Sequence, residues 1–496
     1  MLKKGLIMLL LMLAMLSGCG KKEEIKVFSD LSELNGENMG CMSGSIFDEL
    51  IAERFPDSPI IYYSSRSELL LGLSSGKIAG FVSDEPVAMM MVKANEGVTY
   101  LDEAVGSVDY GICFSSNAKD KLIKFNEYLA KITANGNLEE LQKKWIDPEA
   151  TGRKKADFSL SGENGTLRCV TTPDAAPFSF MADGKFEGYE VELLYEFASE
   201  YGYDLEINTV SFDALLTAVA MNKYDIGFNG IFITPERAKS VSLTTPTYSG
   251  RDVVMISNGN KAAKSDLFTA IKDSIYKNFI EEDRYLLLLN GALTTIEISL
   301  CSIVAGTLFG LLLYILSTRN SLIRNLLDLN QRILAKLPAV VLLMILFYVI
   351  FKTSSLNGTI VSIIGFAFIF GNTVYALLKT GVKAVDYGQK EASLALGYGE
   401  WLSFFHIILP QALKTIADSY LHEIIALIKN TSIVGYVSVT DVTRASDIIR
   451  GRTYDALFPL IVVALLYYLT CSLLIFLIRI PLKDYIERKV KYNDQI

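Results

Sequence analysis

Long apolar runs in the second half of the chain restrict its fold more than any other sequence feature. These runs occupy roughly 287–316, 337–352, 358–379, 412–435 and 456–479. Because a helix of about 20 apolar residues crosses the hydrocarbon core of a bilayer, the pattern predicts about five spans in an all-α transmembrane domain at 285–482. The mean hydropathy of +0.32 supports this prediction, since soluble domains rarely reach that average.

The N-terminus has the order of an export signal. Residues 1–4 carry two lysines, Gly5–Leu16 is apolar but too short to span a bilayer, and Leu16-Ser-Gly-Cys19 follows. This last run resembles the lipobox of bacterial lipoproteins, which implies a signal peptide at 1–19 and a lipid on the Cys19 thiol. An ordinary secretory signal with an incidental cysteine is the alternative. Either signal places the next residues outside the cytoplasm.

Positive charges give an independent indication of the orientation. An exported N-terminus and five crossings leave the tail, 483–496, in the cytoplasm. Lys and Arg gather in the loops and the tail that this topology assigns to the cytoplasm: Arg319, Arg324, Arg332, Lys336, Lys379, Lys383, Lys390 and Lys483. We therefore expect a multi-pass protein of the bacterial cytoplasmic (inner) membrane with its N-terminal domain outside.

Composition argues against several other functions. The net charge is −8 and no basic stripe exists, so nucleic acid is not an expected partner. The six cysteines form no CxxC pair and the two histidines are His406 and His422, so neither a metal site nor a cofactor is predicted. The nearest approach to a phosphate-binding loop, Gly72–Ile78, is one residue short between its glycines. The chain is therefore not expected to be an enzyme.

Two stretches of the exported region resemble type II periplasmic amino-acid-binding proteins. Residues 151–258 resemble the first lobe through Leu167-Arg-Cys-Val170, Pro177-Phe-Ser-Phe180 and Gly230-Ile-Phe-Ile-Thr-Pro-Glu-Arg237. Residues 20–150 resemble the second lobe and its return segment through Ser43-Gly-Ser45 and Gly76–Pro86. The resemblance implies an α/β bilobed domain. Because the second lobe comes first, we predict a circular permutation joined through the Gly-containing linker at 147–164.

The same resemblance implies a polar amino acid as ligand and assigns its contacts. A guanidinium suits the α-carboxylate, an acid suits the α-ammonium, and backbone N–H groups of both lobes supply further donors. The implied contacts are Arg237 for the α-carboxylate, Asp84 for the α-ammonium, Phe212 for the wall, and the backbone near Gly230, Ile231, Ser43, Gly44 and Ser45. Arg237 could instead cap or salt-bridge a helix start, and Asp84 could be a turn residue.

Three positions depart from the family pattern. Ala175 stands where an aromatic residue usually clamps the ligand, and Phe232 stands where Thr usually receives the ammonium. Thr172 occupies a position that is usually acidic, although Asp174 is close enough to substitute if the loop shifts. The resemblance therefore implies an amino acid without identifying it, and lobes that only dock an exported partner remain an alternative.

A linker at 259–284 joins the lobes to the spans. Apolar residues fall at helical spacing from Ser265, a plausible N-cap, to Ile280: Leu267, Phe268, Ile271, Ile275 and Phe279. We predict an amphipathic helix lying on the outer membrane surface, with a helix of the soluble domain as the alternative.

A motif between the third and fourth runs carries the clearest functional signal. Gly388-Gln-Lys-Glu-Ala-Ser-Leu-Ala-Leu-Gly397 is followed by Pro410-Gln-Ala412. This pattern resembles the EAA loop of ABC importer permeases, polar amino-acid branch. The resemblance implies that a short helix docks on an ATPase subunit: Glu391 gives a directional contact, Ala392 allows close approach, Gly397 permits the turn, and Pro410 belongs to the motif. Ser393 stands where a second Ala is commoner.

Taken together, these features predict the membrane subunit of an amino-acid ABC importer with a fused binding domain. The expected partners are two copies of a separate ATPase and a second permease copy, forming a homodimer in the lipid membrane. The alternative from another class is a ligand-gated channel or receptor that uses the same bilobed sensor. It predicts a re-entrant filter sequence, of which Val434-Gly-Tyr436 is only a fragment.

Overall fold

The computed structural model describes residues 26–493 apart from 148, 151–152, 183, 260–266, 353, 355 and 456. The predicted signal peptide with Cys19, the predicted N-cap Ser265 and the last three residues of the predicted tail lie outside the described residues. The chain packs as two units, Met1–Leu288 with Ala445–Val462 and Leu289–Arg444 with Val463–Ile496.

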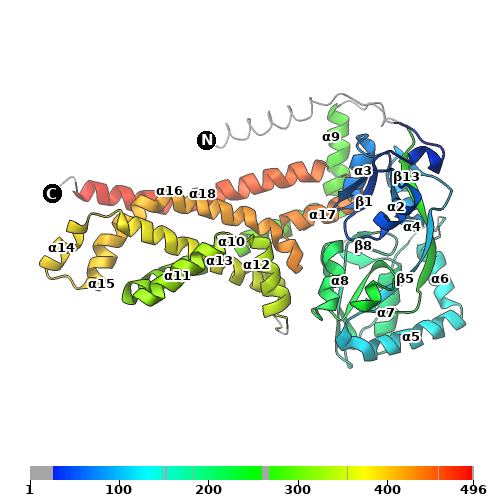
Figure 1. Ribbon diagram of the computed structural model, residues 1–496, viewed down its shortest axis with the longest axis horizontal. Coiled ribbons are helices and arrows are strands. Elements are labelled where there is room, and N and C mark those ends of the chain that lie inside the picture. Colours follow the sequence, from blue (N-terminus) through cyan, green and yellow to red (C-terminus); the bar gives the residue numbers. More distant parts are fainter. Residues whose placement is uncertain are drawn as a thin grey trace. The chain divides into compact units, whose positions relative to one another are not determined.

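The first unit is built around a ten-stranded sheet with the order β10-β6-β11-β5-β13-β3-β1-β2, to which β12 and β4 add at the side (Figure 1). Its strands are β1 (Met39–Met42), β2 (Ile60–Tyr63), β3 (Gly80–Asp84), β4 (Val98–Tyr100), β5 (Gly106–Phe114), β6 (Thr166–Thr171), β10 (Asp204–Thr209), β11 (Ile226–Phe232), β12 (Ser242–Leu243) and β13 (Tyr248–Ser257). A small second sheet contains β7 (Asp174–Ala175), β8 (Ser179–Ala182) and β9 (Lys185–Glu187).

Helices lie between the strands. They are α2 (Phe47–Arg54), α3 (Arg66–Ser74), α4 (Glu85–Ala94), α5 (Lys119–Ala134), α6 (Asn137–Trp145), α7 (Tyr189–Glu200) and α8 (Phe212–Ala220). Those between parallel strands, such as α2, α3 and α8, make the crossovers that a parallel pair requires. The start of α3 shows why the sequence begins a helix there. The Ser65 hydroxyl accepts from the Glu68 N–H, and the Glu68 carboxylate accepts from the Ser64 N–H, which satisfies two backbone donors at the helix end.

The sheet consists of two halves that share two long strands. In one half, β1 pairs in parallel with β2 and β3; in the other, β6 pairs in parallel with β10 and β11. Between them β5 and β13 run antiparallel, and each continues into the opposite half, β5 beside β11 and β13 beside β3. The predicted α/β bilobed fold is thereby confirmed, with the strands of the second lobe first in the chain.

The return segment seals the first lobe. Trp145, at the end of α6, is fully buried, and its indole N–H donates to Glu192 Oε2 of α7 over 2.5 Å. The Lys144 ammonium pairs with the same carboxylate at 2.7 Å. These contacts hold α6 on α7 although 47 residues separate Trp145 from Glu192.

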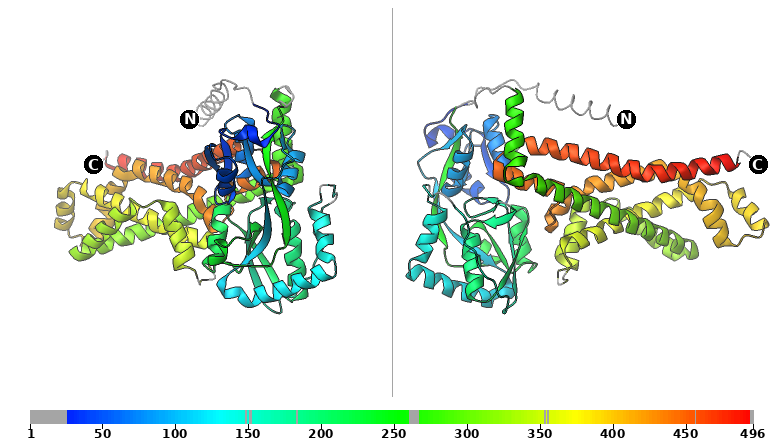
Figure 2. Two further views of the ribbon diagram at one scale, coloured as in Figure 1. Left: turned by 45° about the vertical axis from the view of Figure 1, so that its right-hand side comes forward. Right: turned by 180° about the vertical axis from the view of Figure 1, so that it is seen from behind.

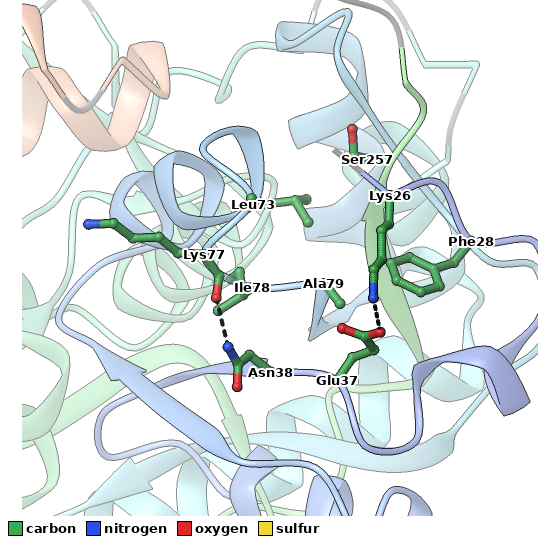
Figure 3. Close-up of a pocket in the computed structure, with 10 residues that line it drawn as sticks. Lys26, Phe28, Glu37, Asn38, Leu73, Lys77, Ile78, Ala79 and Ser257 are labelled. Carbon is green, nitrogen blue, oxygen red and sulfur yellow. Dashed lines mark hydrogen bonds and ion pairs between the residues drawn. The ribbon is translucent and has the colours of Figure 1, made fainter. Parts of the chain in front are cut away.

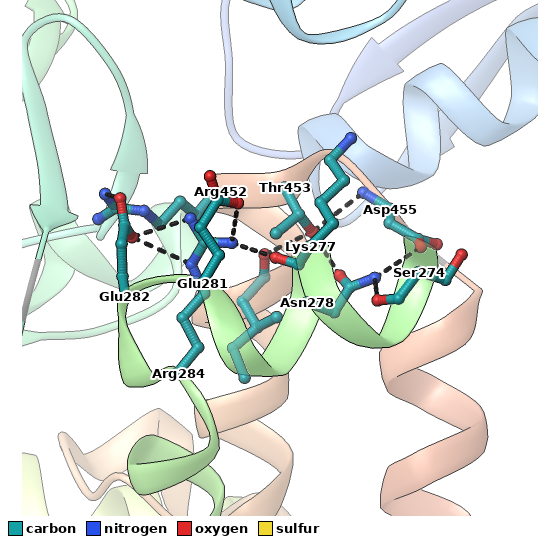
Figure 4. A network of polar contacts seen from close by, with 10 residues as sticks. Ser274, Lys277, Asn278, Glu281, Glu282, Arg284, Arg452, Thr453 and Asp455 are labelled. Atoms are coloured by element: carbon teal, nitrogen blue, oxygen red, sulfur yellow. Dashed lines mark hydrogen bonds and ion pairs between the residues drawn. The ribbon is translucent and has the colours of Figure 1, made fainter. Parts of the chain in front are cut away.

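The linker forms α9 (Leu267–Ile275), a π-turn at Tyr276–Ile280 and a 3₁₀ turn at Glu281–Asp283. Asn278 is fully buried at its centre, where its amide donates to Asp455 Oδ2 and accepts from the Thr453 hydroxyl, both over 2.8 Å (Figure 4). Arg452 pairs with Glu282 beside them. This network fastens the predicted linker helix to the segment 445–462.

The same segment also contacts the lobes. Arg450 pairs with Glu68 Oε1 of α3 over 3.0 Å and is almost fully buried. A Cβ on Gly451 would lie 2.3 Å from the Asp174 Cβ, so only glycine allows this approach. The segment therefore touches both lobes, through Glu68 on the second and Asp174 on the first.

The second unit is helical. Its elements are α10 (Tyr285–Arg319), α11 (Ser321–Leu334), α12 (Ala339–Ile345), a π-turn at Leu346–Ile350, α13 (Gly358–Lys383), α14 (Tyr387–Ala395), α15 (Glu400–Ser403), a π-turn at Phe404–Ile408, α16 (Leu409–Asn430), a 3₁₀ segment at Thr431–Val437, the start of α17 (Val442–Thr453), and α18 (Phe458–Asn493). Figure 2 shows the long helices of this unit running alongside one another.

Small residues let two of these helices approach closely. A Cβ on Gly310 of α10 would lie 2.6 Å from the Gly371 carbonyl oxygen of α13, and one on Gly306 would lie 2.9 Å from the Ala367 carbonyl oxygen. Lipid gives apolar helices little reason to associate through burial alone, so close backbone packing is a main source of their attraction. The glycines of α10 and α13 provide that packing.

Three described helices are long and apolar enough to cross a membrane: Tyr285–Arg319, Gly358–Lys383 and Phe458–Ile478. Ser321–Leu334 and Ala339–Ile350 add a fourth candidate if this pair, bent by 108°, is one span. The run predicted at 412–435 forms α16, which is 22 residues long but carries Lys414, Asp418, His422, Glu423 and Lys429. The structure therefore gives three or four spans by composition where the sequence predicted five, because α16 mixes charge with its apolar residues.

Replacing Asn278 tests the linker network. Asn278→Ala removes the hydrogen bonds to Asp455 and Thr453 at a fully buried position, so we expect a loss of about 1–3 kcal/mol in the free energy of unfolding. Thermal unfolding of the detergent-purified chain measures it. Asn137→Ala, at an exposed position of α6, is the matched control; equal midpoints for the two variants would contradict the structural importance of the network.

Candidate functional site

Arg237 lies between the lobes, directly after β11. The turn that positions it is closed by a bond from its backbone N–H to the Thr234 hydroxyl over 3.2 Å. Its guanidinium is buried and donates to two carbonyls, that of Phe232 at 3.3 Å and that of Gly44, on the other lobe, at 3.5 Å. Burial lowers the pKa of Arg237. No carboxylate among the described residues lies within salt-bridge distance, which leaves its charge available to an anion.

The backbone donors predicted on the second lobe bond within that lobe. Ser43 N–H donates to the Tyr63 carbonyl over 2.9 Å, and Ser45 N–H donates to the Met42 carbonyl over 3.1 Å. Gly44 has a φ of +81°, and a Cβ there would lie 3.2 Å from Asp213 Cα at the start of α8. The lobes are thus in contact at Gly44, with these two amides already satisfied.

The predicted donor on the first lobe is also occupied. Gly230 N–H donates over 2.9 Å to Glu190 Oε2, which comes from the first turn of α7. Gly230 has a φ of +61°, and a Cβ would lie 3.3 Å from the Phe178 ring, so glycine suits both the backbone and the space. The next residue, Ile231, is buried. A ligand carboxylate would therefore compete with Glu190 for this amide.

Asp84 ends β3 and is buried. Its Oδ1 accepts from the Tyr110 hydroxyl over 2.8 Å, and its neighbour across the strand pair is Asp252. Burial raises the pKa of Asp84, while the positive charges of Arg66 and Arg237 oppose that rise. Burial, together with the nearby Asp84 charge, raises the pKa of Asp252 to about 8. Asp84 is thus one member of a buried acidic pair.

Glu190 is a third buried carboxyl in this region. It is fully buried, and its Oε1 has no hydrogen-bond partner among the described residues. Burial, with a further contribution from the Asp84 charge, raises its pKa to about 8. At neutral pH the site therefore holds protons that exposed carboxyls would release.

Asp174 is held on the first lobe by a short polar chain. The Thr172 hydroxyl lies 2.5 Å from Asp174 Oδ1 and 2.9 Å from Asn229 Oδ1. Arg66 of the second lobe approaches Asp174 at 3.9 Å. The acid at 174 thus stands beside the position that Thr172 occupies, and it makes an ion pair from lobe to lobe.

Aromatic rings fill the space between the lobes. Phe232 contacts Phe47 of the second lobe with 5.2 Å between ring centroids, and Tyr110 with 5.1 Å. All three rings are buried. Ala175, where the family has an aromatic clamp, is also buried, and Phe212 is half-buried at the first position of α8. The departure at 232 therefore introduces a ring where a small polar group would leave room.

Sequence reasoning did not anticipate four groups that meet the predicted contacts: Arg66, Tyr110, Glu190 and Asp252. None of these residues has a sequence spacing that signals a site. Tyr110 and Asp252 belong to β5 and β13, which meet only through the long-range strand pairing. The apolar run Val253–Ile256 could have drawn attention to Asp252, since an acid directly before a continuous apolar run is placed at the edge of a buried strand.

A separate cavity of about 420 Å³ opens in the first unit near Leu73, Ile78 and Ser257 (Figure 3). An ion pair between Lys26 and Glu37 lies at its edge. None of the predicted ligand contacts lines it, so it gives no support to those residues.

The loop motif forms the helix α14 that the sequence predicts. Asp386 caps its start by accepting from Gly388 N–H over 2.6 Å, and Gly397, with a φ of +86°, follows its end. Glu391 and Ala392 are exposed, as are Tyr387 and Leu396 at 70% and 77%. Apolar side chains this exposed, beside a carboxylate, are suited to contact with another protein.

The contacts of Ser393 explain why serine stands at a position where the motif more often has alanine. It is the buried residue of α14, its hydroxyl donates to the Lys390 carbonyl over 2.7 Å, and it hydrogen-bonds the Ser403 hydroxyl of α15. A similar side-chain contact links Gln389 to Gln411, next to Pro410 in α16. The structure therefore fixes α14 from behind and leaves Glu391 and Ala392 outward.

The buried carboxyls make stability depend on pH. Because the folded-state pKa values of Glu190 and Asp252 are raised to about 8, the folded state keeps protons that the unfolded chain loses near pH 4. Their stabilisation is complete below pH 4 and is lost as pH rises to 8, with a slope of up to about 1.4 kcal/mol per pH unit and group.

We expect a lower denaturation midpoint at pH 8 than at pH 5, and a smaller difference in Glu190→Gln. The chain has two tryptophans, so in a Trp401→Phe background the fluorescence of Trp145 reports on the first unit alone. Glu163→Gln, at an exposed position of the linker between the lobes, is the control. A midpoint that does not fall from pH 5 to pH 8 would refute the assigned shifts.

Comparison with protein families gives two matches. Residues 167–391 match bacterial extracellular solute-binding proteins, family 3, starting in β6, the first strand of the first lobe. Residues 302–492 match the binding-protein-dependent transport system inner membrane component. The two matches overlap at 302–391.

Individual relatives agree with the second match. The chain is 30% identical over 213 residues to the "Putative glutamine transport system permease protein GlnP" of Rickettsia typhi, covering 42% of this chain and 95% of that protein. It is 30% identical over 218 residues to the arginine transport system permease protein ArtQ of Bacillus subtilis, covering 42% and 94%. A crystal structure of an amino acid ABC transporter with histidines matches at 24% identity over 43% of this chain and 98% of that one, with a TM-score of 0.37. The chain belongs to the family of binding-protein-dependent transport system inner membrane components.

Proposed function

We propose that the chain captures an amino acid between its exported lobes and imports it through its membrane helices, driven by a separate ABC ATPase. The observation that carries the coupling part is α14, a motif helix fixed from behind through Ser393 with Glu391 and Ala392 outward. The amino-acid class draws on the printed names of the glutamine and arginine permeases and on the first-lobe resemblance.

Capture would use the predicted contacts. Arg237 would exchange its two carbonyl partners for the α-carboxylate, which suits a guanidinium far better. Asp84 would take the α-ammonium, with Gly230, Ile231 and the Ser43–Ser45 turn forming the remaining polar surface and Phe212 part of the wall. Asp174 would assist at the position of Thr172. Because the described lobes fill their own interface, the ligand would have to displace Phe232 from between Phe47 and Tyr110.

Coupling would run through the cytoplasmic loop. The exposed ring of Tyr387 and side chain of Leu396 would pack on the ATPase, and Glu391 would add a directional polar contact. Gly397 and Pro410 would keep the turn and the start of α16 in place. One chain presents one such helix, so an ATPase dimer calls for two permease copies, and a homodimer is the simplest assembly. The chain would then need no cofactor of its own.

The N-terminal domain would be anchored outside the cytoplasmic membrane by a lipid on Cys19, with the tail in the cytoplasm. The positive charges of the predicted cytoplasmic loops favour this orientation. It would put the lobes where external solutes are and α14 where ATP is, which importer function requires.

Charge reversal in α14 tests the coupling. With the chain and its ATPase in proteoliposomes, ATP hydrolysis should rise with L-arginine or L-glutamine. Glu391→Arg should remove most of the stimulation, roughly tenfold, because it places a like-signed or unpaired charge in the docking contact. Glu163→Arg, also exposed but in the linker between the lobes, should stay near wild type. Undiminished stimulation in Glu391→Arg would end the assignment of α14.

Cys19→Ala tests the anchor. Cells fed a clickable palmitate should label the wild-type chain and not this variant, because the lipobox thiol is the attachment site. Cys41→Ala, which removes a buried thiol of β1, should keep the label. Labelling of Cys19→Ala, or an unlabelled wild type, would favour an ordinary secretory signal.

A further inference from the structure

Three buried carboxyl groups between the lobes have no cationic side chain of a described residue within ion-pair distance. Asp84, Asp252 and Glu190 are at most 5% exposed, and none forms an ion pair with a described residue. The two cations nearby are otherwise engaged: Arg66 faces Asp174, and Arg237 bonds to carbonyls. The site is therefore richer in acid than one zwitterionic ligand needs, since an α-ammonium satisfies one carboxylate and an α-carboxylate satisfies one guanidinium.

The strand register puts two of these acids side by side. Asp252 of β13 is the direct antiparallel partner of Asp84 in β3, and directly opposed residues project from the same face of a sheet. Whatever reaches Asp84 therefore reaches the neighbourhood of Asp252. The Tyr110 hydroxyl is close to Asp252 but donates its proton to Asp84, so neither Asp252 oxygen has a hydrogen bond among the described residues. This arrangement costs stability unless something occupies these oxygens.

Further unpartnered polar groups border the same space. Glu190 Oε1 and the Asn229 amide nitrogen, both in buried residues of the first lobe, also lack partners among the described residues. Asn229 can only donate through that nitrogen, so it suits an α-carboxylate, whereas Glu190 can accept from a cation. The interface therefore has an unpaired donor, on Asn229, and an unpaired acceptor, on Glu190. An amino acid with an additional positive charge requires both.

Aromatic rings lie beside these charged and polar groups. Tyr110 stacks on Phe178 with 5.3 Å between ring centroids and contacts Phe232 edge-on. The guanidinium of Arg237 already lies 5.6 Å from the Phe232 centroid, so this ring cluster accommodates a guanidinium. Ring faces attract cations, and more strongly where water is excluded.

Building on the proposed capture of an amino acid, we infer that the lobes select one whose side chain is positively charged, and that Asp252, beside Asp84, sets this preference. The α-ammonium goes to Asp84 and the α-carboxylate to Arg237. The side-chain guanidinium or ammonium goes to Asp252 and Glu190, against the ring of Tyr110. With Asp84 and Asp252 ionised and Glu190 protonated, two negative charges face Arg237 and the ligand's net charge of +1, so the charges balance. The unpartnered Asp252 oxygens then gain donors.

Calorimetry of the detergent-purified full-length chain against L-arginine, L-lysine, L-glutamine and L-glutamate tests this inference. L-arginine or L-lysine should bind about tenfold or more tightly than L-glutamine. Asp252→Asn should weaken the cationic ligands by about tenfold and leave L-glutamine within about threefold, because only the former use its charge. Asp102→Asn removes an exposed carboxylate elsewhere in the second lobe and should change nothing.

Each outcome separates the inference from the function on which it rests. Tighter binding of L-glutamine or L-glutamate by the wild type overturns the cationic preference and leaves amino-acid capture standing. No binding by any of the four counts against capture itself. Equal loss for all ligands in a folded Asp252→Asn, as judged by Trp145 fluorescence, overturns the assigned role of Asp252. If that variant does not fold, Asp252→Glu should keep the wild-type order of affinities, and loss of that order refutes the assignment.

Discussion

The antiparallel pairing of β5 with β13 is the interaction on which the rest of the first unit depends. These two strands join the lobes, and each ends beside the strands of the opposite half. Their register sets Tyr248 opposite Tyr110 and brings Asp252 beside Asp84. Any movement of one lobe against the other must therefore bend these strands, so the region of Tyr110 combines the hinge with buried charge.

The interface between the lobes is closed by the chain's own groups. Glu190 takes the Gly230 amide, carbonyls take Arg237, and Phe232 packs against Phe47 and Tyr110. A ligand would offer each of these groups a stronger contact. The Gly230 amide now bonds to a protonated acid, the Arg237 guanidinium bonds to neutral carbonyls, and the Phe232 ring occupies the place of a polar group. Ligand binding to this domain would therefore be a competition. The charged contacts with the ligand must contribute more free energy than is lost when the aromatic rings separate.

The surface that would dock on an ATPase differs from the interface between the lobes, because its contact groups are exposed. In α14 the inward face is fixed by Ser393 and Ser403, and the outward face keeps a carboxylate and apolar side chains exposed. A helix of nine residues is too short to be stable alone, so the bond behind it matters as much as the residues in front. The serine that departs from the family pattern supports the helix without altering the surface it presents.

The sequence by itself determined the class of the protein. The sequence analysis used local patterns: apolar runs, motif spacing and the reversed order of the two lobe-like stretches. These patterns predicted the α/β bilobed domain, the helical membrane part and the position of α14, because such properties depend on neighbours along the chain. The individual ligand contacts stay predictions. Only the tertiary structure decided that Gly230 and Arg237 already have partners, and that Asp252 and Glu190 are both buried within reach of the Asp84 charge. Asp84 and Asp252 are paired across strands far apart in the chain, and Glu190 lies 40 residues from Gly230. Because such contacts form only when the strands and helices pack, no local pattern encodes them.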